Sequence, residues 1–554
     1  MIFDVWRYKV RQAYNFDFKI DYDFLKNEFP HEVYEWVGYW AEKQAERMVV
    51  VDCDKKEYNY RQLLQLARVQ AVNLFELGVR PGDRIATLEM NSLNHFATII
   101  AASLLRAVLV PLNWRLKNPE LLYMINDSKP QVLLYGKKYK ENADFLKQAV
   151  KVFDIDELSS MDTAGSGVKT EIFNARVEEL EKQFFDYGRY NKLNPVIILY
   201  TSGTTGFPKG AMISDLQLKQ NAINTICDWG LAEGERYILS APLFHTGGWN
   251  VLALPLLMAG GEIIIHEKFD AEAILNDIER HKVTLYFGVP TMFISMMESM
   301  AFSSVNLSSI KFFISGGAPC PPYIIETFSK KGVIFRQGFG LTEVGPNCFT
   351  LPCEDSVRKI GSVGFPMKAS RARLIADDGS EVSSDGAVGE LVLGGDHVCM
   401  GYYGREDEFK KTYYDGFFRT GDYAMRDADG YYYIVGRKKE MFISGGENVY
   451  PKEIEDRLTM LPEVLECAVV GVADEKWGEV GLAAITLRGE HFSNLKEVRE
   501  SVENQIRDHL KKYLASYKIP KKIKFYTALP KNAVGKIDKI AIKNEYIAGL
   551  QADK

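Results

Sequence analysis

The sequence predicts an α/β fold with a large N-terminal domain of stacked α/β sheets, a small β subdomain and a small C-terminal α/β domain. Up to about residue 350, short apolar runs alternate with segments of helical period, which is typical of strand and helix units. From about 360 to 435, Gly and Asp turns separate short β-like pieces, and a fresh α/β pattern follows. A chain of 554 residues also exceeds what one hydrophobic core usually supports, so two or more domains are expected.

The N-terminal elements follow from apolar periodicity. A helix is predicted over residues 60–77, where apolar side chains recur at helical spacing. Strands are predicted where short apolar runs end in Gly, Pro or polar turn residues, namely at 84–88, 131–135, 262–265, 283–286 and 311–314. Because the two kinds of element alternate, we expect sheets covered by helices.

The second half of the chain divides near residue 440. In the β subdomain, strands are predicted over 389–393 and 430–435. Beyond it we predict a helix from Pro451, a strand over 467–472 and a helix around 495–512. We therefore assign residues 1–436 to the N-terminal domain, 437–440 to the segment between the domains, and 441–554 to the C-terminal domain.

Composition bounds the class of protein. The formal net charge of -6 gives no overall basic field for nucleic acid, and 46% hydrophobic residues argue against extended disorder. Seven cysteines without a Cys-x-x-Cys pair indicate free thiols in a reducing compartment. The N-terminus lacks the apolar core of a secretory signal, and the most apolar window, 96–112, is too short to span a membrane. These features predict a cytoplasmic protein, and they leave peripheral membrane contact and a homodimer open.

The run at 200–210, Tyr-Thr-Ser-Gly-Thr-Thr-Gly-Phe-Pro-Lys-Gly, is typical of a phosphate-binding loop. Its glycines let the backbone approach a polyphosphate, its hydroxyls can donate to phosphate oxygens, and Lys209 supplies a positive charge. A Walker A loop is excluded, because the position five residues after Gly203 is Pro208 rather than a second glycine. The alternative is a surface hairpin without a ligand.

Further motifs follow in order along the chain. The turn at 313–319 exposes backbone where a flat ring could lie, and 337–343 offers an aromatic face, a hydroxyl and a carboxylate. Alone, each is better explained as a structural turn. Asp422, in the turn at 419–422, could accept hydrogen bonds from ribose hydroxyls or merely cap that turn, and Lys536 follows a glycine near the C-terminus.

Taken in this order, these segments resemble the core motifs of the adenylate-forming enzyme superfamily, which includes acyl-CoA synthetases, peptide-synthetase adenylation domains and luciferases. The resemblance extends from about residue 34 to 539 and is strongest at 201–210, 340–343, 420–422, 436–448 and 535–536. It implies the adenylate-forming enzyme fold, in which the small C-terminal domain is mobile. It also implies a reaction in which a carboxylate attacks the α-phosphate of ATP, and the thiol of coenzyme A then displaces AMP.

The resemblance implies a role for each matching residue. Lys536 would stabilise charge at the α-phosphate, Thr342 would contact that phosphate, and Glu343 with Thr201 would hold Mg²⁺. Asp422 and Arg437 would hold the ribose. The other residues expected to bind ATP are Ser202, Gly203, Thr204, Thr205, Gly206, Lys209, Gly316, Gly317, Ala318, Gln337, Gly338, Phe339 and Gly340.

The resemblance also implies a rotation of the C-terminal domain about Lys439 between the two steps. In the second step Gly445 and Gly446 would line the tunnel for coenzyme A, where a side chain would block the thiol arm. The alternative for Lys439 is a solvated charge. Ten lysines between 511 and 543, against the single acid Asp538, could attract ATP and coenzyme A or form an ordinary solvated face.

The acid would bind among segments 242–249 and 286–290 and the turn at 316. His245 would contact the carboxylate or close the thiol channel, with an ordinary core histidine as the alternative. Gly247 and Gly248 would leave room for a long chain, and Trp249 would form a wall or a movable gate. These segments contain no acidic side chain to pair an ammonium group, which disfavours amino-acid substrates. The sequence therefore predicts an ATP-dependent fatty acyl-CoA synthetase for medium to long chains. An aryl-CoA ligase of the coumarate or benzoate type and a catalytically silent adenylate-binding protein remain as alternatives.

Overall fold

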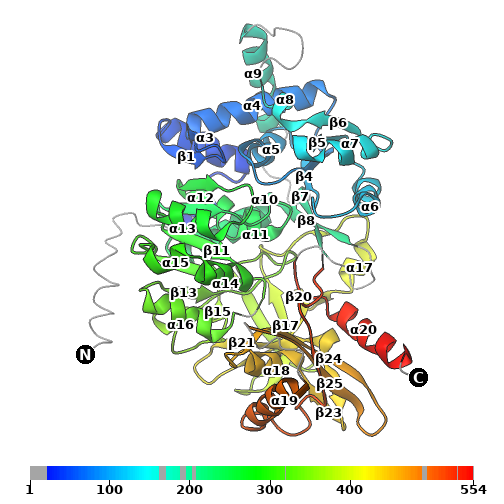
Figure 1. Cartoon of the computed structure of the whole chain (residues 1–554). Coiled ribbons are helices and arrows are strands. Elements are labelled where there is room, and N and C mark those ends of the chain that lie inside the picture. Colours follow the sequence, from blue (N-terminus) through cyan, green and yellow to red (C-terminus); the bar gives the residue numbers. More distant parts are fainter. Residues whose placement is uncertain are drawn as a thin grey trace.

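The computed structural model describes residues 22–160, 170–186, 195–201, 208–318, 320–488, 496–532 and 535–552. Across these residues it confirms the α/β class: two large sheets form the N-terminal part, and a β subdomain and a C-terminal sheet follow (Figure 1). The blue to green elements occupy the upper and middle parts of Figure 1, and the orange to red C-terminal elements lie below them. Within the described ranges, no helix is both long and apolar enough to cross a membrane.

The first large sheet brings together strands from both ends of the N-terminal half. Its order is β13 (Phe335–Gln337), β12 (Phe312–Ser315), β11 (Leu285–Gly288), β9 (Arg236–Leu239), β10 (Glu262–Ile265), β1 (Met48–Val51) and β2 (Glu57–Asn59). All pairs are parallel except β1 with β2. Because β11, β12 and β13 are parallel neighbours, their carboxyl ends meet at one edge, where ligands bind in open α/β sheets.

The second large sheet carries the phosphate-loop hairpin. Its order is β18 (Gly401–Tyr402), β8 (Lys209–Ser214), β7 (Pro195–Thr201), β4 (Val108–Pro111), β3 (Arg84–Leu88), β5 (Val132–Tyr135) and β6 (Lys151–Asp154). Strands β7 and β8 pair antiparallel, with Thr201 opposite Lys209. The short strand β18 comes from the region that the sequence assigns to the β subdomain, yet it pairs with β8.

Helices surround these sheets and begin at recognisable caps. The helix predicted at 60–77 is α4 (Tyr60–Glu76), where Asn59 and Gln62 form a capping box. Ser214 caps α10 (Asp215–Trp229), which ends at Gly230 with φ +67°. The other helices of this part are α2 (Tyr22–Asn27), α3 (Val33–Lys43), α5 (Leu93–Leu104), α6 (Asn118–Ser128), α7 (Lys140–Leu146), α8 (Ile155–Leu158), α9 (Thr170–Asp186), α11 (Thr246–Asn250), α12 (Ala253–Ala259), α13 (Ala271–Arg280), α14 (Pro290–Glu298), α15 (Ala301–Ser304) and α16 (Pro322–Lys330).

The β subdomain is a five-stranded sheet joined to a two-stranded ribbon. The sheet contains β16 (Arg371–Ile375), β17 (Val388–Gly394), β20 (Phe417–Arg426), β19 (Tyr413–Tyr414) and β21 (Tyr432–Arg437), and the ribbon contains β14 (Phe349–Thr350) and β15 (Phe365–Pro366). The short helix α17 (Glu406–Lys410) lies between β18 and β19. The strands predicted at 389–393 and 430–435 correspond to β17, which is one residue longer at each end, and β21, which is shifted by two residues.

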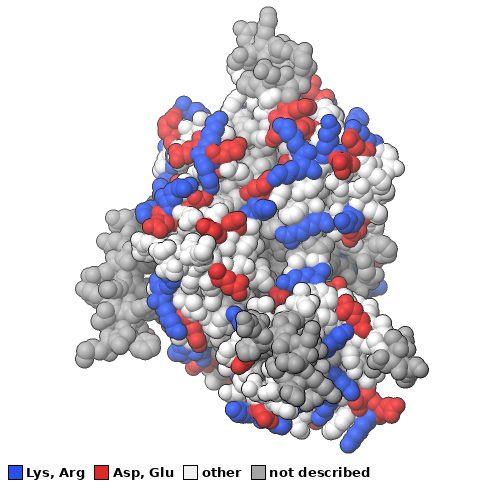
Figure 2. All heavy atoms as spheres, in the orientation of Figure 1, with Lys and Arg blue, Asp and Glu red and all other residues white. Residues whose placement is uncertain are grey.

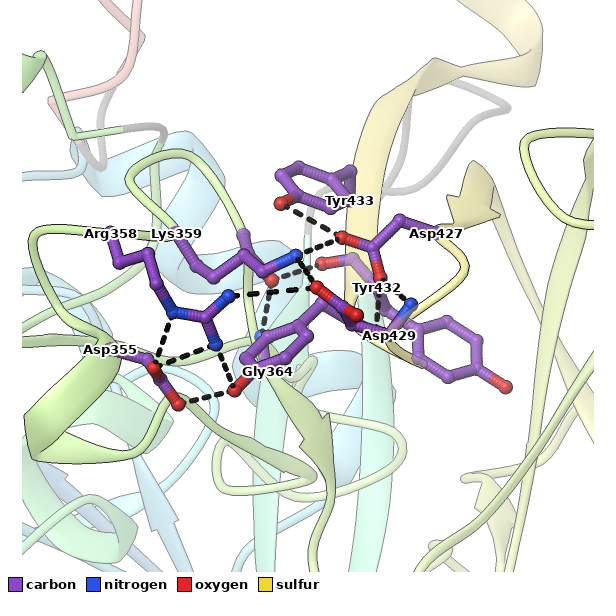
Figure 3. A network of polar contacts seen from close by, with 10 residues as sticks. Asp355, Arg358, Lys359, Gly364, Asp427, Asp429, Tyr432 and Tyr433 are labelled. Atoms are coloured by element: carbon purple, nitrogen blue, oxygen red, sulfur yellow. Dashed lines mark hydrogen bonds and ion pairs between the residues drawn. The ribbon is translucent and has the colours of Figure 1, made fainter.

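A network of charged side chains holds the turn between β20 and β21 (Figure 3). Lys359 Nζ lies 2.7 Å from a carboxylate oxygen of both Asp427 and Asp429. Arg358 pairs with Asp355 at 2.8 Å and with Asp429 at 3.5 Å. We call these five residues the Lys359 network, and it ties the segment around 355–359 to the tip of the β20–β21 hairpin.

The C-terminal part has its own sheet and core. Its strands are β23 (Glu447–Val449), β22 (Phe442–Ser444), β25 (Gly478–Leu487), β24 (Val464–Asp474) and β26 (Lys522–Phe525), and its helices are α18 (Pro451–Leu458), α19 (Lys496–Lys511) and α20 (Lys539–Ala552). Apolar side chains such as Ile454, Val469, Ile485 and Ile506 form its core. A single 3-10 turn, Lys438–Glu440, connects β21 of the β subdomain with β22 of this sheet. The segment predicted at 437–440 comprises Arg437, the last residue of β21, and this turn.

Carboxylates offset much of the C-terminal lysine stretch. Five of its ten lysines form ion pairs, namely Lys511, Lys518, Lys531, Lys539 and Lys543. On the face shown in Figure 2, basic and acidic side chains are interspersed without a large area of one sign. This arrangement favours the ordinary solvated face over electrostatic attraction of ATP and coenzyme A.

Candidate active site

Asp422 and Arg437 face each other across two paired strands. They are register partners in β20 and β21, and Arg437 Nε lies 2.7 Å from Asp422 Oδ1. The other oxygen, Asp422 Oδ2, is buried and has no hydrogen-bond partner among the described residues. A buried acceptor without a partner is costly, so this oxygen is suited to receive ligand hydroxyls such as those of a ribose.

Burial raises the pKa of Asp422 to about 6, although the positive charge of Arg437 opposes the shift. The carboxyl group is therefore ionised above about pH 6 and neutral below it. Because the neutral form is the weaker acceptor for two ribose hydroxyls, we expect adenosine to bind about 10-fold more weakly at pH 5 than at pH 7.5. Calorimetry with adenosine tests this, since adenosine carries no phosphate that titrates in this range.

The matched control for this pH dependence is Asp508→Asn, which changes an exposed carboxylate in α19 of the C-terminal part that pairs with Lys511. It should keep the wild-type pH profile, whereas Asp422→Asn should bind adenosine weakly with little change between pH 5 and 7.5. A profile that stays steep in Asp422→Asn would show that another group governs it.

The two residues expected to hold Mg²⁺ lie together. Thr201 Oγ1 donates a hydrogen bond to Glu343 Oε1 at 3.3 Å, and Tyr402 donates to the same oxygen at 3.0 Å. No described residue donates to Glu343 Oε2. In the described parts of the chain, no group of three or more His, Cys, Asp or Glu side chains could hold a metal. The residues present fit an ion of the Mg²⁺ kind, which is bound through one carboxylate, waters and substrate phosphates.

Only the ends of the predicted phosphate loop lie within the described residues. Ser202, Gly203, Thr204, Thr205 and Gly206 lie outside them, so their expected contacts with ATP stay predictions. Lys209 is described, and its ammonium group is buried in an ion pair with Glu408 of α17. The carboxylate of Glu408 offsets the charge of Lys209 in this structure, and the expected contact of Lys209 with ATP stays a prediction.

The segments expected to enclose adenine meet at the carboxyl edge of the first sheet. Gly316, Gly317 and Ala318 follow β12, and the residues from Gln337 to Gly340 lie at the end of β13 and just after it. Gln337 Nε2 is buried there without a hydrogen-bond partner among the described residues. A nucleobase edge could satisfy such a polar group. Gly338 and Phe339 directly follow Gln337. A Cβ at Gly340 would clash with the backbone of Gly345 and Pro346, so this glycine is required by a local turn.

Lys536 reaches this site from the C-terminal part. Solvent reaches its side chain, yet desolvation lowers the pKa of its ammonium group, as does the charge of Arg437, while Asp422 and Glu343 act in the opposite direction. Its charge therefore lies near both carboxylates. Thr342, the neighbour of Glu343, is buried, and its carbonyl accepts a hydrogen bond from Gln217 of α10 at 3.3 Å.

His245 is neutral at physiological pH. Burial lowers its pKa to about 4, and the positive charges of Lys536 and Arg115 add to the shift. Its Nδ1 accepts a hydrogen bond from the backbone N–H of Gly247 at 3.1 Å. The proton of the neutral ring is therefore on Nε2, which can donate to an anionic group.

The space at the two glycines expected to admit a long chain is filled by protein. A Cβ at Gly247 would lie 3.1 Å from the ring of Phe287, and one at Gly248 would clash with the carbonyl oxygen of Pro242. These glycines let α11 pack closely against its neighbours, which corrects the expectation of open space. Trp249 is completely buried against Phe96, and its indole N–H donates to Leu243, so this packing favours a fixed wall over a movable gate.

The residues expected for the second step lie on the C-terminal part. Lys439 is exposed in the 3-10 turn after β21. Gly445 and Gly446 have φ values of +63° and +88°. A Cβ at Gly445 would lie 2.6 Å from the indole of Trp477, whereas nothing lies within 4 Å of one at Gly446. Their roles as hinge and tunnel lining stay predictions.

Sequence reasoning missed two residues of this region. Tyr402 contacts Glu343 only because β18 crosses to the second sheet, a pairing that no local pattern signals. Arg115 follows β4 and lies near His245, and no sequence pattern noted above includes it.

The chain is similar to known proteins over most of its length. A sequence model of the AMP-binding enzyme family matches residues 38–403, and one of the AMP-binding enzyme C-terminal domain matches residues 453–536. A feruloyl-CoA synthase from an Amycolatopsis species is 36% identical over 88% of this chain and 94% of its own length. A long-chain-fatty-acid–CoA ligase from Mycobacterium tuberculosis is 32% identical over 88% of this chain and 93% of its own.

Among solved structures, an O-succinylbenzoate coenzyme A synthetase from Bacillus subtilis, in complex with ATP and magnesium ion, has the same fold. The two superpose with a TM-score of 0.78 and are 28% identical, covering 92% of this chain and 98% of that one.

Proposed function

Because the chain belongs to the AMP-binding enzyme family, we propose that it is an AMP-forming acid–CoA ligase whose acid is compact and aromatic. ATP and coenzyme A are its other substrates, and Mg²⁺ is its metal ion. The observation that carries the chemistry is the approach of Lys536, from the C-terminal part, to Asp422 and Glu343 of the N-terminal part. The family match to both parts agrees with a site built from residues so far apart in the sequence.

In the first step the acid's carboxylate attacks the α-phosphate of ATP, which releases pyrophosphate and leaves acyl-AMP. Lys536 reduces the repulsion between the two anions and stabilises charge that develops at the α-phosphate. Asp422 Oδ2 accepts from the ribose, and the Nε2–H of His245 can donate to a carboxylate oxygen of the acid. Mg²⁺ bound through Glu343 would screen the charge of the pyrophosphate group.

In the second step the thiol of coenzyme A attacks the acyl carbon, and AMP leaves. The carbon–sulfur bond forms as the bond from the acyl carbon to the phosphate oxygen breaks. A rotation about Lys439 would withdraw Lys536 and bring Gly445 and Gly446 to the acyl-AMP.

The class of acid is inferred from how the pocket is filled. The Phe287 ring lies between Gly247 and Gly316, since a Cβ at these positions would come within 3.1 Å and 3.2 Å of it. Phe287 is itself only 6% exposed. A ring in this place shortens the pocket and offers a flat apolar surface, which favours an aromatic acid over a long alkyl chain. The feruloyl-CoA synthase and O-succinylbenzoate synthetase among the relatives agree with this inference.

A medium- to long-chain fatty acid is the second candidate, because the Mycobacterium tuberculosis relative is a long-chain-fatty-acid–CoA ligase. The two candidates are separated by AMP release that depends on coenzyme A. The panel contains cinnamic, benzoic and arylacetic acids beside straight-chain fatty acids of short to long length. We expect the highest kcat/KM among the aromatic acids.

The variant Phe287→Ala gives this experiment a structural control. Removing the ring opens the space between Gly247 and Gly316, so kcat/KM for longer acids should rise relative to that for cinnamic acid. Fatty acids ahead of aromatic acids in the wild type would transfer the assignment to the second candidate. ATP binding without turnover of any acid would support an adenylate-binding protein instead.

A further inference from the structure

Arg115 is a cation without an anionic partner beside the active site. It follows β4, and its guanidinium lies over two aromatic rings, 4.8 Å from the centroid of Trp114 and 5.7 Å from that of Phe244. Neither an ion pair nor a side-chain hydrogen bond connects it to another described residue. Cation–π contact with two rings restrains a guanidinium while leaving N–H groups available to donate.

Two observations place this guanidinium at the adenylation site. Phe244 directly precedes His245, and the charge of Arg115 contributes to the lowered pKa of that histidine together with Lys536. A Cβ on Gly535 would lie 3.8 Å from Arg115 Nη1, so the glycine before Lys536 packs close to the guanidinium. Arg115 and Lys536 thus flank His245 from the N-terminal and C-terminal parts.

The surroundings of Arg115 favour an anion rather than solvent alone. Partial desolvation lowers the pKa of its guanidinium although the residue as a whole is exposed, and no described carboxylate pairs with it. A guanidinium without a carboxylate partner is suited to bind an anion with two oxygens, because it can donate one hydrogen bond to each of them. Both the phosphates of ATP and the carboxylate of the acid offer such a pair.

We propose that Arg115, held between Trp114 and Phe244, forms an oxyanion subsite of the adenylation site and binds either a phosphate group of the nucleotide or a carboxylate group of the acid. This proposal rests on the function proposed above. It gives the site a second cation in addition to Lys536. Unlike Lys536, Arg115 belongs to the N-terminal part and would stay in place when the C-terminal domain rotates.

The test compares Arg115→Ala, Arg115→Lys and Arg115→Gln with the wild type in full-length protein. Calorimetry gives the affinity for Mg·ATP and for inorganic pyrophosphate without any acid, and steady-state kinetics give KM for cinnamic acid at saturating ATP. We expect Arg115→Ala to weaken one of the two kinds of ligand about 10- to 100-fold. Arg115→Lys should restore part of the loss because it keeps the charge, whereas Arg115→Gln should not.

The pattern identifies the anion. Loss of affinity for ATP and pyrophosphate with an unchanged KM for the acid assigns the subsite to phosphate, and the reverse pattern assigns it to the carboxylate. The matched control is Arg371→Ala, because Arg371 likewise lies over an aromatic ring, that of Phe417 at 5.0 Å, and forms no ion pair with a described residue. It should leave all three quantities unchanged.

Two outcomes would overturn the proposal. One is wild-type affinity and KM in Arg115→Ala. The other is an equal loss for every ligand in Arg115→Ala and Arg115→Gln accompanied by a lower melting temperature, which would assign Arg115 a structural role. Because the nucleotide measurements require no acid, a wrong assignment of the acid would leave them interpretable.

Discussion

Replacement of Lys536 by alanine should lower the rate of acyl-AMP formation on the order of 10²-fold or more, equivalent to about 3 kcal/mol of lost stabilisation of the transition state. The reason is electrostatic. Lys536 brings a positive charge to Asp422 and Glu343, where the α-phosphate and the metal ion are expected. In its absence the attacking carboxylate and the polyphosphate repel each other without compensation. Exchange of labelled pyrophosphate into ATP, dependent on the acid, measures this step.

The same variant should form the thioester from preformed acyl-AMP at nearly the wild-type rate, because the α-phosphate charge no longer develops in that step. The control is Lys512→Ala, which removes another exposed lysine of the same domain. Equal losses in both half-reactions would contradict the role proposed for Lys536 and would indicate general damage to the C-terminal domain.

The reverse separation is expected for Lys439→Pro. Lys439 lies in the 3-10 turn between the β subdomain and the C-terminal sheet, and its side chain is exposed. Proline fixes φ near -65° and would restrict the backbone change that a rotation requires. The rate of acyl-AMP formation should therefore remain close to wild type. The rate of thioester formation should fall by about 10-fold or more, because the C-terminal domain would not reach its second orientation. Rapid-quench measurement of each half-reaction checks this.

Adenylation in the same variant serves as the internal control for Lys439→Pro, because it reports on folding and on the conformation described here. If thioester formation stayed at the wild-type rate, the domain would not rotate about this residue.

The fold could largely be predicted because most of its elements carry local signals. The run at 84–88 became β3 and 262–265 became β10 with the predicted bounds, since each is a buried strand between clear turns. The helix predicted at 60–77 became α4, which the Asn59 cap begins. Strand β18 could not be placed, because its partner β8 lies almost 200 residues earlier and two residues carry no periodicity.

The site could be predicted where a motif fixes chemistry and less well where packing decides. Asp422 with Arg437, and Thr201 with Glu343, lie close together, as their shared expected ligands require. The ion pair of Lys209 with Glu408 could not be predicted, because the two residues are about 200 positions apart in the sequence. Gly248 differs because a glycine can admit either a ligand or a neighbouring backbone, and only the three-dimensional packing distinguishes the two.

The Lys359 network bears on how acyl-AMP can stay bound when one active site carries out both adenylation and thioester formation. It fastens the tip of the β20–β21 hairpin at Asp427 and Asp429, while the other end of the same hairpin carries Asp422 and Arg437 and continues directly into Lys439. A hairpin fastened at its tip resists bending, so torque from a turning C-terminal domain would be relieved in the 3-10 turn rather than in the strands. Asp422 and Arg437, which are expected to bind the ribose, would then keep their positions while the C-terminal domain rotates. Acyl-AMP would remain bound between the two chemical steps.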